Sequence, residues 1–152
     1  MTQYQGKTVV ITGAASGLGA AMADVLAAAG ARLALLDIDG ERAQAKASVL
    51  REAGVDVLAL PVDVANKASL AAFAEAVQNR FGSCDVLCAN VGVQQFGAID
   101  TLTDEDWAWV LSVNVTGMVD TVACFLPLLR KASGERHIVL TASASYFTPG
   151  VR

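Results

Sequence analysis

The chain has little of the side-chain chemistry that metal centres and disulfide-stapled folds require. Its 152 residues include one histidine, His137, with no cluster of other metal ligands beside it, so metal catalysis has no support. The three cysteines, Cys84, Cys88 and Cys124, are an odd number and lie in apolar segments. This pattern predicts buried, reduced thiols in a cytoplasmic protein that holds no metal ion.

Positive charge and long apolar runs are also scarce. The formal net charge of −4 at pH 7 argues against a nucleic-acid partner. No run reaches the roughly 18 uninterrupted apolar residues of a membrane helix, so we expect no membrane span. Residues 1–6 have neither a basic start nor a long apolar stretch, so we expect no signal peptide. Because the mean hydropathy is high, at +0.47, the excess apolar surface is expected to meet other protein.

Apolar strand-like runs alternate with helix-like segments throughout the chain. With 54% hydrophobic and 17% charged residues, the composition suits one domain, residues 1–152, with a sizeable core. Strands are predicted at 7–12, 32–37, 55–62, 84–90 and 137–141, and helices at 17–29, 39–53, 66–81 and 103–132. Strict alternation of apolar strands with helices predicts an α/β fold. We expect an incomplete Rossmann-type, doubly wound parallel sheet, with strand order 3-2-1-4-5 and helices on both faces.

The last predicted helix is apolar around most of its circumference. Thr103 is a suitable N-cap, and Asp106 stands at the capping-box position three residues later. A helix that is apolar all round is expected to be buried all round, with one face on the sheet and the other on a second subunit or on further protein. This pattern predicts a homodimer or homotetramer through residues 104–132. Trp107 and Trp109 are expected to serve core or interface packing.

The segment after the first predicted strand is the most informative in the chain. It reads Thr-Gly-Ala-Ala-Ser-Gly-Leu-Gly from Thr12 to Gly19 and precedes an alanine-rich helix. Gly13, Gly17 and Gly19 have the spacing G-x-x-x-G-x-G. Glycines let the backbone turn tightly and approach phosphates, and the start of the helix supplies free N–H groups and a positive dipole end. The segment therefore predicts a site for the pyrophosphate of a dinucleotide.

An acidic residue closes the second predicted strand. Asp37 lies 18 residues after Gly19, where an acid in a dinucleotide-binding fold accepts hydrogen bonds from ribose hydroxyls. Its charge would repel a 2′-phosphate, and the positions that could supply a compensating cation hold Ser16 and Ile38. The sequence therefore favours NAD over NADP.

Further motifs follow the glycine segment in order. They are Asp63-Val64, Ala89-Asn90-Val91-Gly92, Asn114-Val115-Thr116-Gly117, and a fifth strand that ends in Thr141-Ala142-Ser143. Together with the glycine segment, these motifs resemble the N-terminal portion of the short-chain dehydrogenase/reductase family, although Ala89 and Val91 replace an Asn and an Ala of that family's Asn-Asn-Ala-Gly. The resemblance implies cofactor contacts from Gly13, Ala15, Ser16, Gly17, Leu18, Gly19, Asp37, Ile38, Asp63, Val64, Asn90, Val91 and Gly92.

The resemblance also implies a reaction. In this family a hydride passes between the nicotinamide and the carbon of an alcohol or carbonyl substrate, and a tyrosine with a lysine four residues later moves the proton. The resemblance assigns catalytic roles to Ser143, which positions the substrate oxygen, and Asn114, which helps to hold a proton relay. It places the tyrosine past Arg152, so we expect the chain to be the N-terminal part of a longer protein. Tyr146 is a weak substitute because Gly150 stands where the lysine would be.

Three functions remain open from the sequence. The first is an NAD-dependent oxidoreductase for a secondary alcohol or ketone, which requires a C-terminal continuation with Tyr-x-x-x-Lys. The second is a non-catalytic NAD-binding module, or a remnant of an enzyme, that associates through its long apolar helix. The third, an S-adenosylmethionine methyltransferase or another nucleotide-binding α/β protein, would need a different glycine spacing and leaves the Asn114 and Ser143 motifs unexplained.

Overall fold

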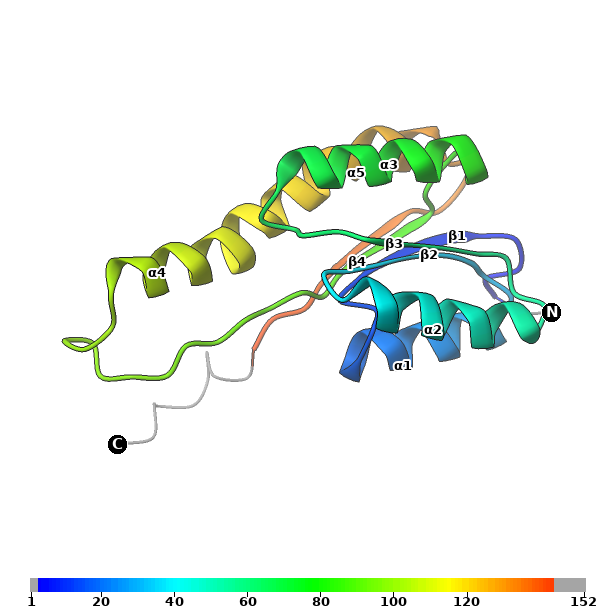
Figure 1. The fold of residues 1–152 in the computed structure, drawn as a ribbon. Coiled ribbons are helices and arrows are strands. Elements are labelled where there is room, and N and C mark those ends of the chain that lie inside the picture. The colour runs from blue at the N-terminus through cyan, green and yellow to red at the C-terminus, as the bar shows by residue number, and fades with distance from the viewer. Residues whose placement is uncertain (1–2, 144–152) are drawn as a thin grey trace.

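The computed structural model describes residues 3–143 of the chain. Its parallel sheet has the order β3-β2-β1-β4-β5. The strands are β1 (Thr8–Thr12), β2 (Arg32–Asp37), β3 (Val57–Pro61), β4 (Val86–Ala89) and β5 (His137–Leu140). Helices α1 (Gly17–Ala28) and α2 (Gly40–Glu52) cover one face, and α3 (Lys67–Phe81) and α5 (Met118–Lys131) cover the other (Figure 1). The predicted class, strand order and two helical layers are confirmed.

Alternation along the central strand divides the core into two halves. In β1, Val10 belongs to the half under α3 and α5, while Val9 and Ile11 belong to the half under α1 and α2. All three side chains are fully buried, because a parallel sheet covered on both faces has no wet side. In the first half, the rings of Phe73 and Phe125 meet edge to face with centroids 6.1 Å apart, which locks α3 to α5.

Four predicted strands are longer than the strands observed, and the largest excess, three residues each, is at 55–62 and 84–90. The backbone N–H of Val55 donates to the carbonyl of Leu50 at the end of α2, and that of Cys84 donates to Leu128 in α5. The backbone N–H groups of both residues are therefore bonded to helices and not to a neighbouring strand. Their side chains are apolar like those of the strands that follow, which is why the predicted strands began too early. Cys84 and Cys88 are buried free thiols, as predicted, whereas the prediction of burial is wrong for Cys124, which is only half-buried in α5. Burial raises the pKa of Cys84 to about 12.

The long C-terminal helix differs most from expectation. It consists of α4 (Asp104–Leu111), a π-helical segment η1 (Ser112–Gly117) and α5. The capping box of Thr103 and Asp106 is confirmed. The predicted cover from a second subunit or further protein stays a prediction, and within the described chain α4 has no buried residue and Leu111, Val115 and Val119 are exposed. The reason is geometric, because α5 packs on α3 and β4 while α4 extends beyond the end of the sheet (Figure 1).

The same helical segment is also long and apolar enough to cross a membrane. Residues Asp104–Lys131 form 28 helical residues with a mean hydropathy of 1.5, and 22% of the apolar window is buried. Length and composition alone support this possibility, and a helix that covers a sheet meets the same criteria. Packing of α5 on α3 and β4 accounts for the apolar residues of its inner face.

Strand β5 lies at an edge of the sheet. It pairs with β4, and all four of its residues are exposed in the part of the chain that the structure describes. Ile138, Val139 and Leu140 are 42%, 46% and 51% exposed. The sheet therefore has an exposed apolar edge, next to the segment that carries Ser143.

Candidate functional site

The carboxyl ends of the parallel strands meet at one edge of the sheet, where the segments that follow them line a cavity of about 590 Å³. This is the edge at which doubly wound folds bind ligands. The cavity also reaches the long helix. Its lining consists of Gly13, Ser16, Gly17, Leu18, Asp37, Ile38, Val62, Asp63, Val64, Ala65, Asn90, Val91, Gly92, Val93, Trp109, Val113 and Thr141.

The turn between β1 and α1 brings one stretch of backbone directly against another. Gly13 has a φ of +65°, which a side chain rarely tolerates. Gly19 lies in the first turn of α1, where an added Cβ would overlap the carbonyl oxygen of Gly13. Ser16 is the N-cap of α1, but its side chain makes no capping hydrogen bond. The first N–H groups of α1 have no intrahelical partner and stand beside the cavity, which suits an anion.

The Asp37 carboxylate is fixed at the wall of the cavity by two backbone donors. Its Oδ2 accepts a hydrogen bond from the N–H of Ala15 at 2.9 Å, and its Oδ1 accepts one from the N–H of Asp39 at 3.0 Å. These bonds hold the end of β2 against the glycine turn. Each carboxylate oxygen keeps a further lone pair for a hydroxyl donor. Ile38, which also lines the cavity, is 74% exposed.

Hydrogen bonds join three strand ends beneath the cavity. Thr12, which is 1% exposed, accepts at Oγ1 from the backbone N–H groups of Asn90 at 2.8 Å and Val91 at 3.1 Å. The Asn90 Oδ1 in turn accepts from the Thr141 hydroxyl at 2.9 Å. The ends of β1, β4 and β5 are therefore tied into one floor for the cavity.

Replacing Thr12 by valine is expected to lower the free energy of unfolding by about 2 to 3 kcal/mol. Valine has nearly the same shape but leaves the half-buried N–H groups of Asn90 and Val91 without their acceptor. The matched variant Thr12→Ser keeps the hydroxyl and should cost less than about 1 kcal/mol. Urea unfolding of both variants measures the difference, and equal losses would show that the hydroxyl does not stabilise the floor.

Asn114 fixes the cavity wall through its side chain. Its Oδ1 accepts a hydrogen bond from the N–H of Val93, and its Nδ2 donates one to the Val93 carbonyl, both at 2.8 Å. The amide lies in η1 and therefore couples the π-helical segment to the loop after β4. This geometry makes Asn114 a positioning residue in the described part of the chain. The implied role in a proton relay stays a prediction.

A glycine lets the long helix approach the loop after β3. A Cβ on Gly117 would lie 3.0 Å from the carbonyl oxygens of both Val64 and Ser112. Real Cβ atoms rarely come so close to other atoms, so only glycine allows this separation without a shift. The approach brings Val113, which is 6% exposed, against the end of the cavity formed by residues 62–65.

A second cavity of about 470 Å³ shares the Asn90–Val93 wall and Thr141 with the first. Both predicted catalytic residues, Asn114 and Ser143, line it. The structure thus places them beside the predicted cofactor residues, on the side away from Asp37, which lines the first cavity and not the second. Tyr146 lies outside the described residues.

The predicted cofactor residues gather as the sequence implied. All of them line the first cavity except Ala15 and Gly19, which shape it through the Asp37 bond and the close approach to Gly13. Sequence reasoning missed Val62, Ala65, Val93, Trp109, Val113 and Thr141. Trp109 and Val113 are four residues apart on the helix that carries Asn114, and this spacing was the available signal. Neither tryptophan belongs to the core, since each is 45% exposed.

Comparisons with known proteins agree with this geometry. The sequence model of the short chain dehydrogenase family matches residues 7–151. The chain belongs to the short-chain dehydrogenase/reductase family. It is 38% identical over 134 residues to an uncharacterized short-chain type dehydrogenase/reductase of Sinorhizobium fredii, covering 86% of this chain and 53% of the relative. The chain spans about half the length of the curated relatives that it matches.

Among the similar solved structures, one contains NAD and another contains a derivative of NADP. A short-chain dehydrogenase/reductase of Burkholderia phymatum in complex with NAD has a TM-score of 0.93 and 37% identity, covering 99% of this chain and 53% of that one. An alcohol dehydrogenase of Thermococcus sibiricus complexed with 5-hydroxy-NADP has a TM-score of 0.79 and 37% identity, covering 82% of this chain and 53% of that one. The family therefore binds NAD or NADP.

The residues of this chain fit such a cofactor. The Gly13–Gly19 approach brings the glycine turn against the start of α1, and the helix N-terminus supplies donors for a pyrophosphate. Asp37 supplies acceptors for a ribose diol. Residues 3–143 contain no cluster of three or more His, Cys, Asp or Glu that could hold a metal ion. The donor set therefore matches a dinucleotide cofactor.

Proposed function

We propose that this chain binds NAD and forms the cofactor-binding part of an oxidoreductase. In this proposal the reaction transfers a hydride between the nicotinamide and a secondary alcohol or ketone. The enzyme acts through a longer polypeptide that carries the Tyr-x-x-x-Lys implied by the family resemblance. The supporting observation is the cavity of about 590 Å³ that joins the glycine turn to Asp37 and continues into the cavity of Asn114 and Ser143.

The preference for NAD rests on charge at the end of β2. The Asp37 carboxylate stays beside the cavity because Ala15 and Asp39 donate to it, so a 2′-phosphate would be brought against a fixed negative charge. The neighbouring wall residues Ser16 and Ile38 carry no positive charge that would compensate. A ribose with both hydroxyls free would instead donate hydrogen bonds to the carboxylate.

The chemistry divides between the cofactor and the side chains of the second cavity. When bound, the nicotinamide supplies the hydride acceptor or donor. The Ser143 hydroxyl would hold the substrate oxygen by a hydrogen bond, and a serine is too weak a base near pH 7 to take the proton itself. Asn114 would keep the wall between the two cavities in register through its two bonds to Val93. Proton transfer then falls to the tyrosine of the continuation.

Calorimetric titration of the chain with NAD and NADP tests the cofactor assignment. We expect NAD to bind with a dissociation constant on the order of micromolar, and NADP at least about 10-fold more weakly. A polypeptide extended through Tyr-x-x-x-Lys should reduce NAD when given secondary alcohols. A folded chain that binds neither dinucleotide would contradict the proposal.

The exposed side of the long helix favours a second candidate. Leu111, Val115 and Val119 are 48%, 53% and 62% exposed, which supports an NAD-binding module that associates through this helix without turnover. Binding of NAD without turnover in the extended polypeptide would select this candidate over the enzyme. Sedimentation equilibrium tests the association, and a monomer at all concentrations would exclude it.

A further inference from the structure

Trp109 lines the cavity of the proposed NAD site, whereas Trp107 does not. The two tryptophans lie in the same exposed helix, α4, and have the same exposed fraction of 45%. Large aromatic side chains left this exposed usually meet a partner. Their exposed fractions are equal, so the two tryptophans differ in position: only Trp109 lies at the wall of the cavity.

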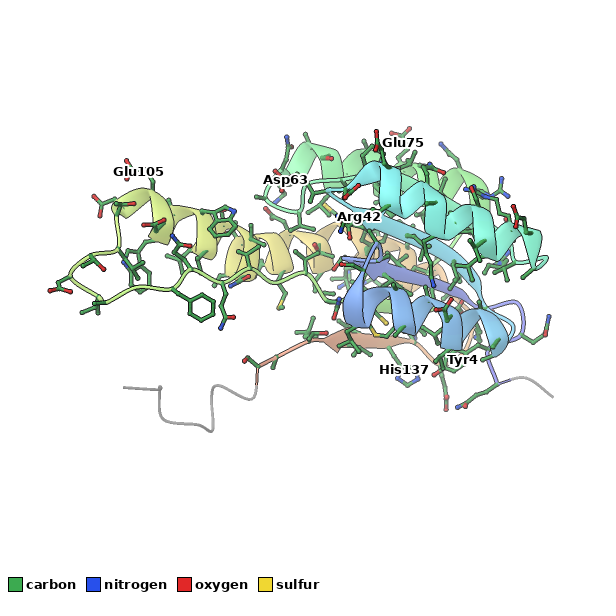
Figure 2. The ribbon with its side chains drawn as sticks, turned by 60° about the horizontal axis from the view of Figure 1, so that its bottom comes forward. Tyr4, Arg42, Asp63, Glu75, Glu105 and His137 are labelled. Atoms are coloured by element: carbon green, nitrogen blue, oxygen red, sulfur yellow. The ribbon has the colours of Figure 1, made fainter. Side chains whose placement is uncertain are left out.

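Contacts at both ends of the helix hold Trp109 in place. At its start, the Asp106 carboxylate accepts from the backbone of Thr103 at 3.0 Å and from Gln95 Nε2 at 2.9 Å. At the other end, Asn114 binds both backbone groups of Val93. These bonds fasten α4 to the loop after β4, although α4 extends away from the sheet, with Glu105 near its outer end (Figure 2). The backbone that carries Trp109 is therefore held beside the cavity that its side chain lines.

Trp109 borders the apolar end of the cavity. It lies one helical turn before Val113, on the same face, and Gly117 holds this helix against the carbonyl of Val64. Val62 and Val64, from the loop after β3, complete this end. Phosphate donors are concentrated at the glycine turn and acceptors at Asp37. The remaining end has the aliphatic side chains of Val62, Val64 and Val113 and one indole, with Asp63 and Ala65 beside them, and the Asp63 carboxylate accepts from the Ala65 N–H at 2.9 Å. Such an end suits a flat heteroaromatic base that carries an amino group.

We infer that Trp109 stacks on the adenine base of NAD and closes that end of the site. The inference rests on the proposed function, because it needs NAD in this cavity. Stacking of a base on an aromatic side chain is strong and needs no hydrogen bond from the base. The long helix would then contribute two side chains to the cofactor site. The Asn114 amide positions the wall of the cavity, and the Trp109 indole covers the base.

Binding measurements on the 152-residue chain separate this role from general packing. We expect Trp109→Ala to weaken binding of both NAD and ADP-ribose by about 10-fold, because both ligands carry the adenine. Binding of nicotinamide mononucleotide, which lacks adenine, should change by less than about 2-fold. Trp109→Phe keeps a ring and should restore most of the affinity. The matched control Trp107→Ala, with equal exposure on the same helix, should bind like the parent.

Fluorescence gives a second measurement that does not depend on removing Trp109. In Trp107→Phe the remaining tryptophan is Trp109, and ADP-ribose should quench its emission. In Trp109→Phe the remaining tryptophan is Trp107, and ADP-ribose should leave its emission nearly unchanged. Nicotinamide mononucleotide should quench neither variant.

The outcomes distinguish the inference from the function on which it rests. If the parent binds NAD but Trp109→Ala binds ADP-ribose equally well, the stacking role is wrong and the cofactor assignment stands. Equal losses in Trp107→Ala and Trp109→Ala would also overturn the inference, because they would indicate a general effect on α4. If the folded parent binds no NAD, the proposed function fails and the inference fails with it.

Discussion

Gly19→Ala is expected to weaken NAD binding by about 100-fold and to lower the free energy of unfolding by about 3 kcal/mol. The new Cβ would overlap the carbonyl of Gly13, so the glycine turn has to move away from α1. Backbone atoms make this contact, and no rotation of a side chain can relieve it. The movement would displace the N–H donors that the pyrophosphate needs. Calorimetric titration and urea unfolding measure the two effects.

A glycine far from the cavity provides the control. Gly54, after α2, has a φ of +83° and no atom within 4 Å of an added Cβ. Gly54→Ala should therefore cost only about 1 to 2 kcal/mol of stability, from backbone strain, and leave NAD affinity unchanged. Comparing the two variants separates strain from steric overlap. Unchanged NAD affinity in Gly19→Ala would show that the close approach to Gly13 is not required for binding.

The double variant Asp37→Ala, Ile38→Arg is expected to change the ratio of NAD to NADP affinity by about 100-fold in favour of NADP. Removing the carboxylate eliminates the repulsion of a 2′-phosphate and the acceptors for the ribose hydroxyls. The arginine adds a planar donor suited to phosphate, at a position that lines the cavity and is 74% exposed. Parallel titrations with both dinucleotides give the ratio.

The structure shows that this experiment also needs a stability measurement. The Asp37 carboxylate accepts from Ala15 and Asp39, so its removal should cost about 1 to 2 kcal/mol. The single variant Ile38→Arg keeps these bonds and shows the effect of the cation alone. An unchanged affinity ratio in a folded double variant would refute the role of Asp37 in cofactor choice.

Much of the fold could be predicted because its signals are local. The apolar strands, the helix starts near Asp39 and Asn66, and the Thr103–Asp106 box each depend on residues a few positions apart. The glycine turn and Asp37 were identified for the same reason. Strand limits were less accurate where an apolar residue such as Cys84 bonds to a distant helix instead of the sheet.

The unpredicted features depend on contacts between segments far apart in the chain. Thr141 joins the site through Asn90, and Gly117 through Val64, and no local pattern indicates either pairing. The apolar residues of the long helix likewise do not indicate where the sheet ends. Once α4 extends past the strands, Trp109 borders the cavity instead of the core.

The sequence by itself determined the α/β architecture, the place of the phosphate turn and the acid at the end of β2. These follow from periodicity and from backbone conformations that only certain residues adopt. Tertiary structure alone decided how the side chains are used. In the folded chain two backbone N–H groups donate to the Asp37 carboxylate, and the Asn114 amide is hydrogen-bonded to Val93. Trp109 lies at the wall of the cavity. The physical reason is that hydrogen bonds and cavity walls depend on distances between strand ends and helices, which are fixed only when the sheet assembles.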